Sequence, residues 1–530
     1  MAADPADLRT PPWAREAMGA VVALAIAIAT VAVVASTPRS ELLLRDGDSL
    51  VTTLVVRSLA AGQPQDWAMS SVLFVPETAV LGILSLWGLG SEGTLLVAGV
   101  ANLVALYGAL RLVAGARRPG SAPVAGSLLA LAAFALLAVT EASADRDALE
   151  PASLLLTTTY YSATVIAAVV AFGLARRGLD APQRRAHVWV LAGVAAASVL
   201  TNPLFTAWAT VPLSVVLVVV GLRARRREDP PSATSPPFAT PTRVGSAAWM
   251  LLAALVAGSA AGFVARVPLS PLIANTGAGY ADPSQWAQSL AYYAGLAADR
   301  LAEPAGAAAG VLGAVLWAWC AVASVMLARR AHVGAAVAAA CGWLVPLLVV
   351  VGAIVLGTHA ARYLQPVAFA PLLGLAVLPD LAPQRLRLGR IVLAASTAGA
   401  LVLAAGLGIP RLVTAASAPD PDLACVVAWT DASGRTGAGQ FWTVRLPKAH
   451  AADPRALVQV DHEVRGYAWL VNRDDFAVGD VTFLVRDDES VPFALPGGVT
   501  EADAASLVDC GRYTIVDFGD RTLPLGPQRS

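Results

Sequence analysis

The sequence predicts a polytopic α-helical membrane protein with about eleven spanning helices and a small C-terminal α/β or β-rich domain. Hydrophobic residues make up 57% of the 530-residue chain and charged residues only 14%, a balance typical of multi-pass membrane proteins. Long apolar runs continue to about residue 410. Short apolar runs then alternate with turn residues, as in a soluble domain. We therefore divide the chain into a transmembrane domain, residues 1–410, and a soluble domain, residues 411–530.

The expected spans are apolar runs close to the length that crosses a bilayer. The first is long for a signal-peptide core, so we expect an uncleaved anchor. One further run, 72–90, contains Pro76 and Glu77, and counting it as a span would invert every later connection. We expect it to lie as a helix at the outer membrane face, within a long first outer loop, 38–92. The spans lie near residues 17–37, 93–115, 123–141, 151–175, 187–202, 204–222, 244–265, 305–327, 333–356, 361–379 and 389–409.

The arginines predict the orientation of these spans. They gather in every second connection, and such loops stay on the cytoplasmic side. The N-terminus is then cytoplasmic, the soluble domain is extracytoplasmic, and the protein is a multi-pass protein of the plasma (inner) membrane. The proline-rich inner connection 223–243 reads as a disordered linker. The arginines concerned are 117, 118, 176, 177, 184, 185, 223, 225–227, 329, 330, 385, 387 and 390.

The soluble domain is expected to consist mainly of strands. Apolar runs bounded by turn residues occur at 441–447, 457–461, 467–472, 481–485 and 513–519, and residues 500–508 suggest a helix. The segment 437–442, GAGQFW, is not read as a phosphate loop because the lysine and the strand–loop–helix context are missing. Cys425 and Cys510 flank the domain and could pair in an oxidising space, although the sequence leaves this open.

Charge and composition exclude some functions. The formal net charge is zero, so no basic footprint for nucleic acid is present. No Cys/His cluster has the spacing of metal ligands, and Cys320 and Cys341 are expected to be core residues. The sequence shows no convincing internal repeat, and its spans are nearly free of ionisable residues. Both observations argue against an envelope-lipid transporter or flippase.

The acidic signature Asp46-Gly47-Asp48 follows the first span directly. Two carboxylates where a helix leaves the lipid place acid/base chemistry at the membrane surface. Aspartate and serine also cap helix N-termini, so a capping role for DGDS is the alternative. The two roles can coexist.

The order of motifs around this signature resembles that of the GT-C superfamily of polytopic membrane glycosyltransferases. Asp48 is followed by LAAG at 59–62, then by Pro64 and Trp67, and RYLQP occurs much later, at 362–366. The resemblance covers about residues 15–410 by architecture but only these two patches by motif. It implies a polyprenyl-phosphate sugar donor, an acidic catalytic base after the first helix, an Arg-Tyr-x-x-Pro near the outer face, and inversion at the anomeric carbon.

The proposed chemistry also follows from the residue types. Transfer of a sugar to a hydroxyl needs a base, for which we select Asp48, assisted by Asp46. The leaving group is a stable phosphate anion, so no strong general acid is needed. The paired acids are also compatible with a divalent metal. An arginine such as Arg362, at the start of the tenth span beside Tyr363 and His359, suits a lipid phosphate. An interfacial anchor is the alternative for these three residues.

Other polar residues of the outer loops are weaker candidates. Asp145 and Asp147 occupy the loop where the superfamily often adds a further site residue, but a solvated loop is the alternative. Aromatic residues of 266–304 suit either sugar stacking or a membrane-interface belt. The acceptor is a cell-envelope glycan, a lipid or a protein. A non-catalytic membrane scaffold is the remaining rival function.

Overall fold

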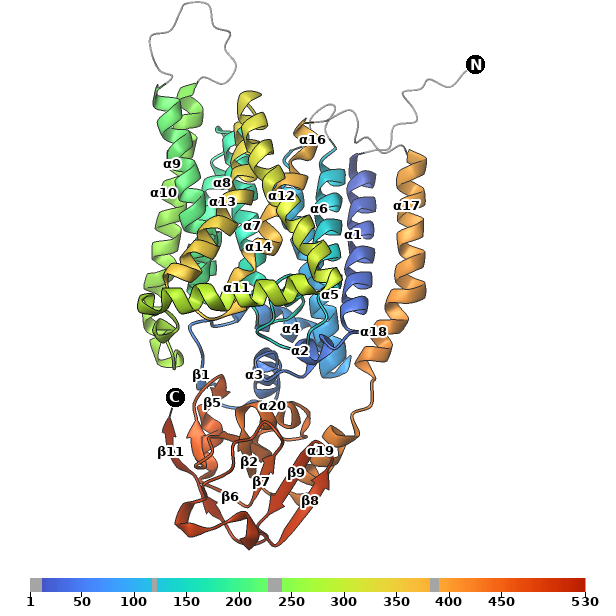
Figure 1. Ribbon diagram of the computed structural model, residues 1–530, viewed down its shortest axis with the longest axis vertical. Coiled ribbons are helices and arrows are strands. Elements are labelled where there is room, and N and C mark those ends of the chain that lie inside the picture. The colour runs from blue at the N-terminus through green and yellow to red at the C-terminus, as the bar shows by residue number, and fades with distance from the viewer. Residues whose placement is uncertain (1–11, 117–121, 227–240, 382–389, 530) are drawn as a thin grey trace, which may run out of the picture.

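The computed structural model describes residues 12–116, 122–226, 241–381 and 390–529. A bundle of long helices stands above a smaller domain that contains most of the strands (Figure 1). Among the described residues, nine helices are long and apolar enough to cross a membrane. This arrangement indicates a multi-pass membrane protein.

Every one of the eleven apolar runs contains helix. Two of the helices, α6 (Pro123–Val139) and α8 (Ala186–Thr201), are shorter than the nine. The count of eleven and the orientation of the bundle stay predictions. The long helices are α1 (Pro12–Val34), α5 (Gly90–Val113), α7 (Ser162–Asp180), α9 (Val211–Arg226) with the π-helical turn Thr206–Thr210, α10 (Pro241–Ala265), α12 (Pro304–Arg329), α13 (Val333–Val355), the broken segment Ala361–Leu381, and α17 (Arg390–Leu403) continuing through a π-turn into α18 (Ile409–Ala416).

The span expected at 151–175 is wrong at its first end, because helix α7 begins only at Ser162. The preceding residues form a 3₁₀ turn and an irregular segment. Thr157 donates to the carbonyl of Leu154 and accepts from the amide of Tyr160. Hydroxyl side chains that bond locally to the backbone compete with helix formation. This irregular segment forms one wall of the candidate site.

The first outer loop is well structured. It contains α2 (Ser40–Leu44), α3 (Val51–Ala60), the two-residue strand β1 (Trp67–Ala68) and α4 (Val75–Ser85). Helix α4 has 11 residues, or about 16 Å, roughly half the thickness of a bilayer core. This length agrees with a helix that does not cross the membrane.

The connection 266–304 also contains helix. Helix α11 (Trp286–Ala302) runs across the bundle, nearly at right angles to the long helices (Figure 1). Its side chains Trp286, Leu290 and Leu301 are exposed. An amphipathic helix that lies crosswise in this way suits the membrane interface.

The soluble domain is built on a seven-stranded sheet of mixed direction. Strand β2 lies parallel to both of its neighbours, β3 and β7, and α20 (Phe441–His450) joins β2 to β3. The sheet order is β11 (Gly526–Arg529), β4 (Arg465–Tyr467), β3 (Leu457–Val460), β2 (Gly437–Gln440), β7 (Phe483–Arg486), β9 (Tyr513–Asp517) and β8 (Ser506–Cys510). Three short strands lie outside this sheet: β5 (Val471–Asn472), β6 (Asp480–Val481) and β10 (Leu523–Pro524).

Two expectations for this domain are wrong. Residues 441–447 form helix α20 instead of a strand, so GAGQFW does join a strand to a helix, still without a lysine after the glycines. Residues 500–508 form a 3₁₀ turn, Glu501–Asp503, followed by strand β8 instead of a helix. In both cases tertiary packing decided between two structures that short apolar runs permit equally.

Cysteine placement agrees with the sequence. Cys320 and Cys341 are free and buried. Cys425, on α19 (Pro421–Ser433), and Cys510, at the end of β8, form a disulfide across 85 residues. The disulfide is consistent with an oxidising compartment for this domain.

The soluble domain docks on the first outer loop. Strand β1 pairs antiparallel with β5, and Asn472 donates to the carbonyl of Pro64 at 2.6 Å. Arg57 on α3 donates to the carbonyls of Ala449 and Ala451 at the end of α20. Segments about four hundred residues apart in sequence therefore form one junction.

Some predictions fall outside the described residues. These are the linker residues 227–240 and the arginines 117, 118, 227, 385 and 387. The domain boundary placed at residue 410 lies within α18, and the chain enters α19 at Pro421.

Candidate functional site

The acidic signature forms a tight turn between α2 and α3. The carboxylate of Asp46 accepts from the amide of Asp48 at 3.0 Å and from the amide of Ser49 at 3.4 Å. Helix α3 has Leu50 as its N-cap residue, with no side-chain capping bond. Asp46 therefore holds the turn, and helix capping does not explain the presence of Asp48.

Asp48 and Arg362 line the same small cavity, of about 60 Å³. Arg362 belongs to the 3₁₀ turn Ala361–Leu364, before the first of the three prolines that break the segment 361–381. We call this space the acid cavity. Its lining comes from six separate parts of the chain: Asp48, Ser70, Ser71, Val72, Phe74, Thr159, Tyr160, Tyr161, Tyr280, Arg362, Tyr363, Trp469 and Leu470.

Burial raises the pKa of both acids, and neighbouring charges modify this rise. Burial raises the pKa of Asp48, while the guanidinium groups of Arg362, Arg445 and Arg146 oppose this rise. Burial, followed by the neighbouring Asp48 charge, raises the pKa of Asp46 to about 6. A carboxyl group with a raised pKa is a stronger base once it is ionised, and such groups often mark functional sites.

Arg146 lies beside the acidic turn. Its Nη1 atom is 3.7 Å from the carboxylate of Asp46, and its guanidinium stacks 3.6 Å from the ring centre of Trp442 on α20. The Nη1 atom is buried, and no hydrogen-bond partner for it occurs in the described parts of the chain. A cation held in place by an aromatic ring, with an unused donor, is available to an anionic or hydroxylated ligand.

Arg445 connects the soluble domain to the acidic turn. It is fully buried, and its Nε atom donates to the carbonyl of Gly47 at 2.7 Å. Burial lowers the pKa of Arg445 to about 10, so the group still carries its charge at neutral pH. Gly47 also leaves little room for a side chain, because a Cβ atom there would lie 3.0 Å from Trp442. The soluble domain thus fixes the position of the acids.

Backbone strain concentrates around the acid cavity. Five non-glycine residues within the described ranges have a positive φ angle, and three of them, Phe74, Tyr161 and Leu470, line this cavity. Left-handed conformations of large side chains cost free energy and persist where the surrounding structure imposes them, often at functional sites.

The remaining predicted site residues have different positions. Tyr363 lines the acid cavity. His359 is exposed and packs against Tyr292 instead. Asp145 and Asp147 lie on an exposed turn outside the cavity lining, although the charge of Asp147 contributes to the raised pKa of Asp48.

The structure adds residues that the sequence did not single out for the site. Tyr160, Tyr161, Tyr280, Trp469 and Arg445 come from segments read as spans, as interface or as a domain core. A signal for the first two was present, since a Tyr-Tyr pair after three threonines (157–159) is unusual in an apolar run. The contributions of Trp469 and Arg445 depend on domain docking, which has no local signal.

A second cavity, of about 560 Å³, adjoins the acid cavity inside the bundle. Its walls are mostly apolar residues of α4, α5, α7 and α8. Val72 lines both cavities, and the segment 158–162 contributes Thr158 and Ser162 to this one and Thr159, Tyr160 and Tyr161 to the other. Glu77 also lines it, and burial raises the pKa of this carboxyl to about 7. We call it the apolar cavity.

A group of charged residues beside the acid cavity has a different character. Arg39 is fully buried, and its guanidinium donates to the Ser153 hydroxyl and to the carbonyls of Ser143, Asp145 and Glu150. The carboxylate of Glu150 also lies 3.1 Å from Arg300 on α11. Glu141 accepts from the amides of Ala152 and Ser153. We call Arg39, Glu141, Glu150 and Arg300 the Arg39 cluster.

A divalent metal ion would need a set of protein ligands at this site. Within residues 12–116, 122–226, 241–381 and 390–529, no group of three or more His, Cys, Asp or Glu side chains is arranged to hold a metal ion. Asp46 and Asp48 would therefore need water or substrate oxygens to complete a coordination shell.

No protein-family model matches this sequence, and no curated protein matches it as a relative.

Proposed function

We propose that this chain is a glycosyltransferase of the GT-C type in the plasma (inner) membrane. It would transfer a sugar from a polyprenyl phosphate to an acceptor hydroxyl at the outer face. The observation that supports this most directly is that Asp48 and Arg362 line one cavity. Such a displacement needs a base beside the attacking hydroxyl and a cation beside the leaving phosphate, and one cavity holds both kinds of side chain.

The reaction would use these residues as follows. The carboxylate of Asp48 takes the proton of the acceptor hydroxyl as the hydroxyl oxygen attacks the anomeric carbon. The bond between that carbon and the phosphate oxygen breaks, and its electron pair leaves with the polyprenyl phosphate. Arg362 and, at the turn, Arg146 stabilise the negative charge on the departing phosphate. Attack opposite the leaving group inverts the anomeric carbon.

Two further features support a lipid-linked substrate outside the cell. The apolar cavity adjoins the acid cavity and has the size and lining expected for part of a lipid chain. The disulfide of the soluble domain fits an extracytoplasmic position, and that domain supplies Trp469 to the acid cavity.

The test is an Asp48→Asn variant of the full chain in lipid nanodiscs, assayed with a panel of radiolabelled polyprenyl-phosphate sugars and a membrane extract as acceptor. Loss of the base should lower transfer by about 10³-fold, within the range attributed to general bases. The matched control is Asp66→Asn, because Asp66 is an exposed aspartate of the same outer loop, paired with Arg473. Equal transfer by both variants, with equal melting temperatures, would overturn the proposal.

A further inference from the structure

Three consecutive threonines, 157–159, lie in the irregular segment before α7, and all three are buried. Two of their hydroxyl groups are used within the protein. The hydroxyl of Thr157 donates to the carbonyl of Leu154 at 2.8 Å. The hydroxyl of Thr158 lies 2.6 Å from the hydroxyl of Thr52 on α3. Thr159 differs from these two neighbours.

The hydroxyl of Thr159 is buried and faces no protein partner. The residue is only 4% exposed, and its Oγ1 atom makes no hydrogen bond among the residues that the structure describes. Thr159 also lines the acid cavity. A buried hydroxyl without a hydrogen bond costs free energy, and most such groups in folded proteins have a partner. An unpartnered hydroxyl at the wall of a cavity therefore indicates a ligand that supplies the missing bond.

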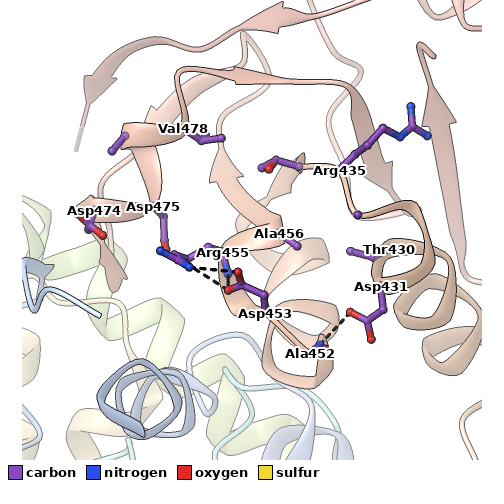
Figure 2. A pocket seen from close by; sticks show the side chains of 13 residues that line it. Thr430, Asp431, Arg435, Ala452, Asp453, Arg455, Ala456, Asp474, Asp475 and Val478 are labelled. Carbon is purple, nitrogen blue, oxygen red and sulfur yellow. Dashed lines mark hydrogen bonds and ion pairs between the residues drawn. The ribbon is translucent and has the colours of Figure 1, made fainter. Parts of the chain in front are cut away.

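A larger hollow, of about 550 Å³, lies in the soluble domain (Figure 2). Charged side chains of this hollow form ion pairs within the protein. Arg455 lies 3.4 Å from the carboxylate of Asp453, as the dashed lines in Figure 2 show. Asp475 lies 2.9 Å from the ammonium of Lys448. The size of a hollow is therefore not sufficient to mark a ligand site, and the partners of its polar groups are more informative.

Thr159 lies where the two cavities of the bundle adjoin. Thr158 and Ser162 line the apolar cavity, whereas Thr159 lines the acid cavity together with Arg362. A lipid chain in the apolar cavity, with its phosphate at Arg362, would bring the attached sugar into the acid cavity beside this segment. The unpartnered hydroxyl thus lies in the part of the site that the sugar would enter.

Gln365 connects the wall that carries Thr159 to the turn that carries Arg362. Its Nε2 atom donates to the carbonyl of Tyr160 at 2.8 Å and to the carbonyl of Arg362 at 3.2 Å. Tyr160 directly follows Thr159 in the chain. The threonine hydroxyl and the guanidinium are therefore borne by segments that are fixed to each other, as the recognition of a single substrate requires.

We propose that Thr159 binds a hydroxyl group of the donor sugar and so selects a glycosylated lipid phosphate over the bare lipid phosphate. This inference rests on the proposed function, because that function brings a sugar into the acid cavity. A sugar hydroxyl, like that of threonine, both donates and accepts hydrogen bonds. A site that binds a substrate hydroxyl in this way rejects an analogue that lacks it.

The volume of the acid cavity limits the size of the sugar. The cavity measures about 60 Å³, which is room for about four or five water molecules. A space of this size admits one monosaccharide at most. The substrate class is therefore a lipid phosphate that carries a single sugar with free hydroxyl groups.

The experiment measures equilibrium binding to the full chain in nanodiscs. The ligands are polyprenyl phosphate, bare or carrying mannose, glucose, galactose or arabinose, and an Asp48→Asn background is used to prevent turnover. For each sugar we compare the Kd of the bare lipid phosphate with that of the glycosylated one, as a ratio. Thr159→Val should lower this ratio about fivefold, the order expected for loss of one hydrogen bond between neutral groups. The Kd of the bare lipid phosphate and the melting temperature should stay unchanged.

Two further variants control for the fold. Thr159→Ser keeps the hydroxyl group and should keep the ratio. Thr158→Val makes the same change at the adjacent residue, whose hydroxyl already has a partner in Thr52. It should lower the melting temperature and leave the ratio unchanged.

The outcomes separate this inference from the proposed function. A ratio that falls in Thr159→Val, but not in Thr159→Ser or Thr158→Val, supports the inference. A ratio of one for every sugar, an unchanged ratio in Thr159→Val, or an equal fall in Thr158→Val overturns it and leaves water as the partner of the hydroxyl. If sugar-dependent binding through Thr159 is present but no sugar is ever transferred, the transferase proposal fails while the Thr159 site stands.

Discussion

The acid cavity and the Arg39 cluster contain the same residue types on adjacent parts of the fold. In the Arg39 cluster, the guanidinium of Arg39 makes four hydrogen bonds to the protein, and both carboxylates accept backbone amides. Beside the acid cavity, the buried Nη1 atom of Arg146 has no hydrogen-bond partner among the residues that the structure describes. Charged side chains whose hydrogen bonds are made within the protein stabilise the fold. A charged side chain that keeps a free donor is available to bind a ligand.

Breaking the Arg39 cluster should have the largest effect, and it should act on folding. Arg39→Met leaves the buried carboxylate of Glu150 with one cation fewer and four acceptors without their donor. We expect a loss of about 3–5 kcal/mol in the free energy of unfolding, measured by denaturant unfolding in detergent. The control Arg521→Met changes an exposed arginine and should cost less than about 0.5 kcal/mol. An equally small effect for Arg39→Met would remove the distinction between the two regions.

The corresponding change in the acid cavity should act on turnover instead. Arg362→Lys keeps the charge but loses the planar pair of donors that suits a phosphate. We expect turnover to fall by about 10²–10³-fold, as for loss of a transition-state donor, with an unchanged melting temperature. Normal turnover in a correctly inserted variant would reduce Arg362 to an interfacial anchor.

A variant of Arg445 tests whether the soluble domain affects the pKa of the proposed base, Asp48. Its charge lowers the pKa of Asp48, so Arg445→Gln should raise that pKa further and move the acid limb of the pH–rate profile to higher pH. We expect turnover at neutral pH to fall, because a larger fraction of the Asp48 side chains is then protonated and cannot act as the base. A variant that lost activity without any shift of the acid limb would show that Arg445 serves only the packing of Gly47.

The last expected effect is on the free energy of unfolding, and it comes from the buried carboxyl group of Asp46 in the acidic turn. The pKa of Asp46 rises to about 6 on folding, so the folded state holds this proton more tightly than the unfolded state. Stability from this group is present at low pH and is lost as the pH rises through about 6. Asp46→Asn should therefore stabilise the protein by up to about 3 kcal/mol at pH 8 and by nothing near pH 3. Stabilisation that does not depend on pH would contradict this origin.

The soluble domain shows how far local patterns can be trusted. Residues 457–461 and 513–519 are short apolar runs bounded by turn residues, and strands β3 and β9 do form there. Residues 441–447 contain the same kinds of side chain but form α20, because the segment must cross between the parallel strands β2 and β3. A right-handed connection between parallel strands needs such a helix, and the parallel pairing is not visible in the sequence.

The sequence by itself determined the apolar helices, the two long connections 38–92 and 266–304, and the position of Asp48 and Arg362 outside or at the ends of predicted spans. These features depend on hydrophobic length and on residue order, which are local properties. Only the tertiary structure decided that Asp48 and Arg362 share a cavity, that Arg39 donates four hydrogen bonds within the protein, and that Arg445 and Trp469 reach the acids from the far end of the chain. Burial and pKa depend on neighbours that lie up to about four hundred residues away, so no local pattern could supply them.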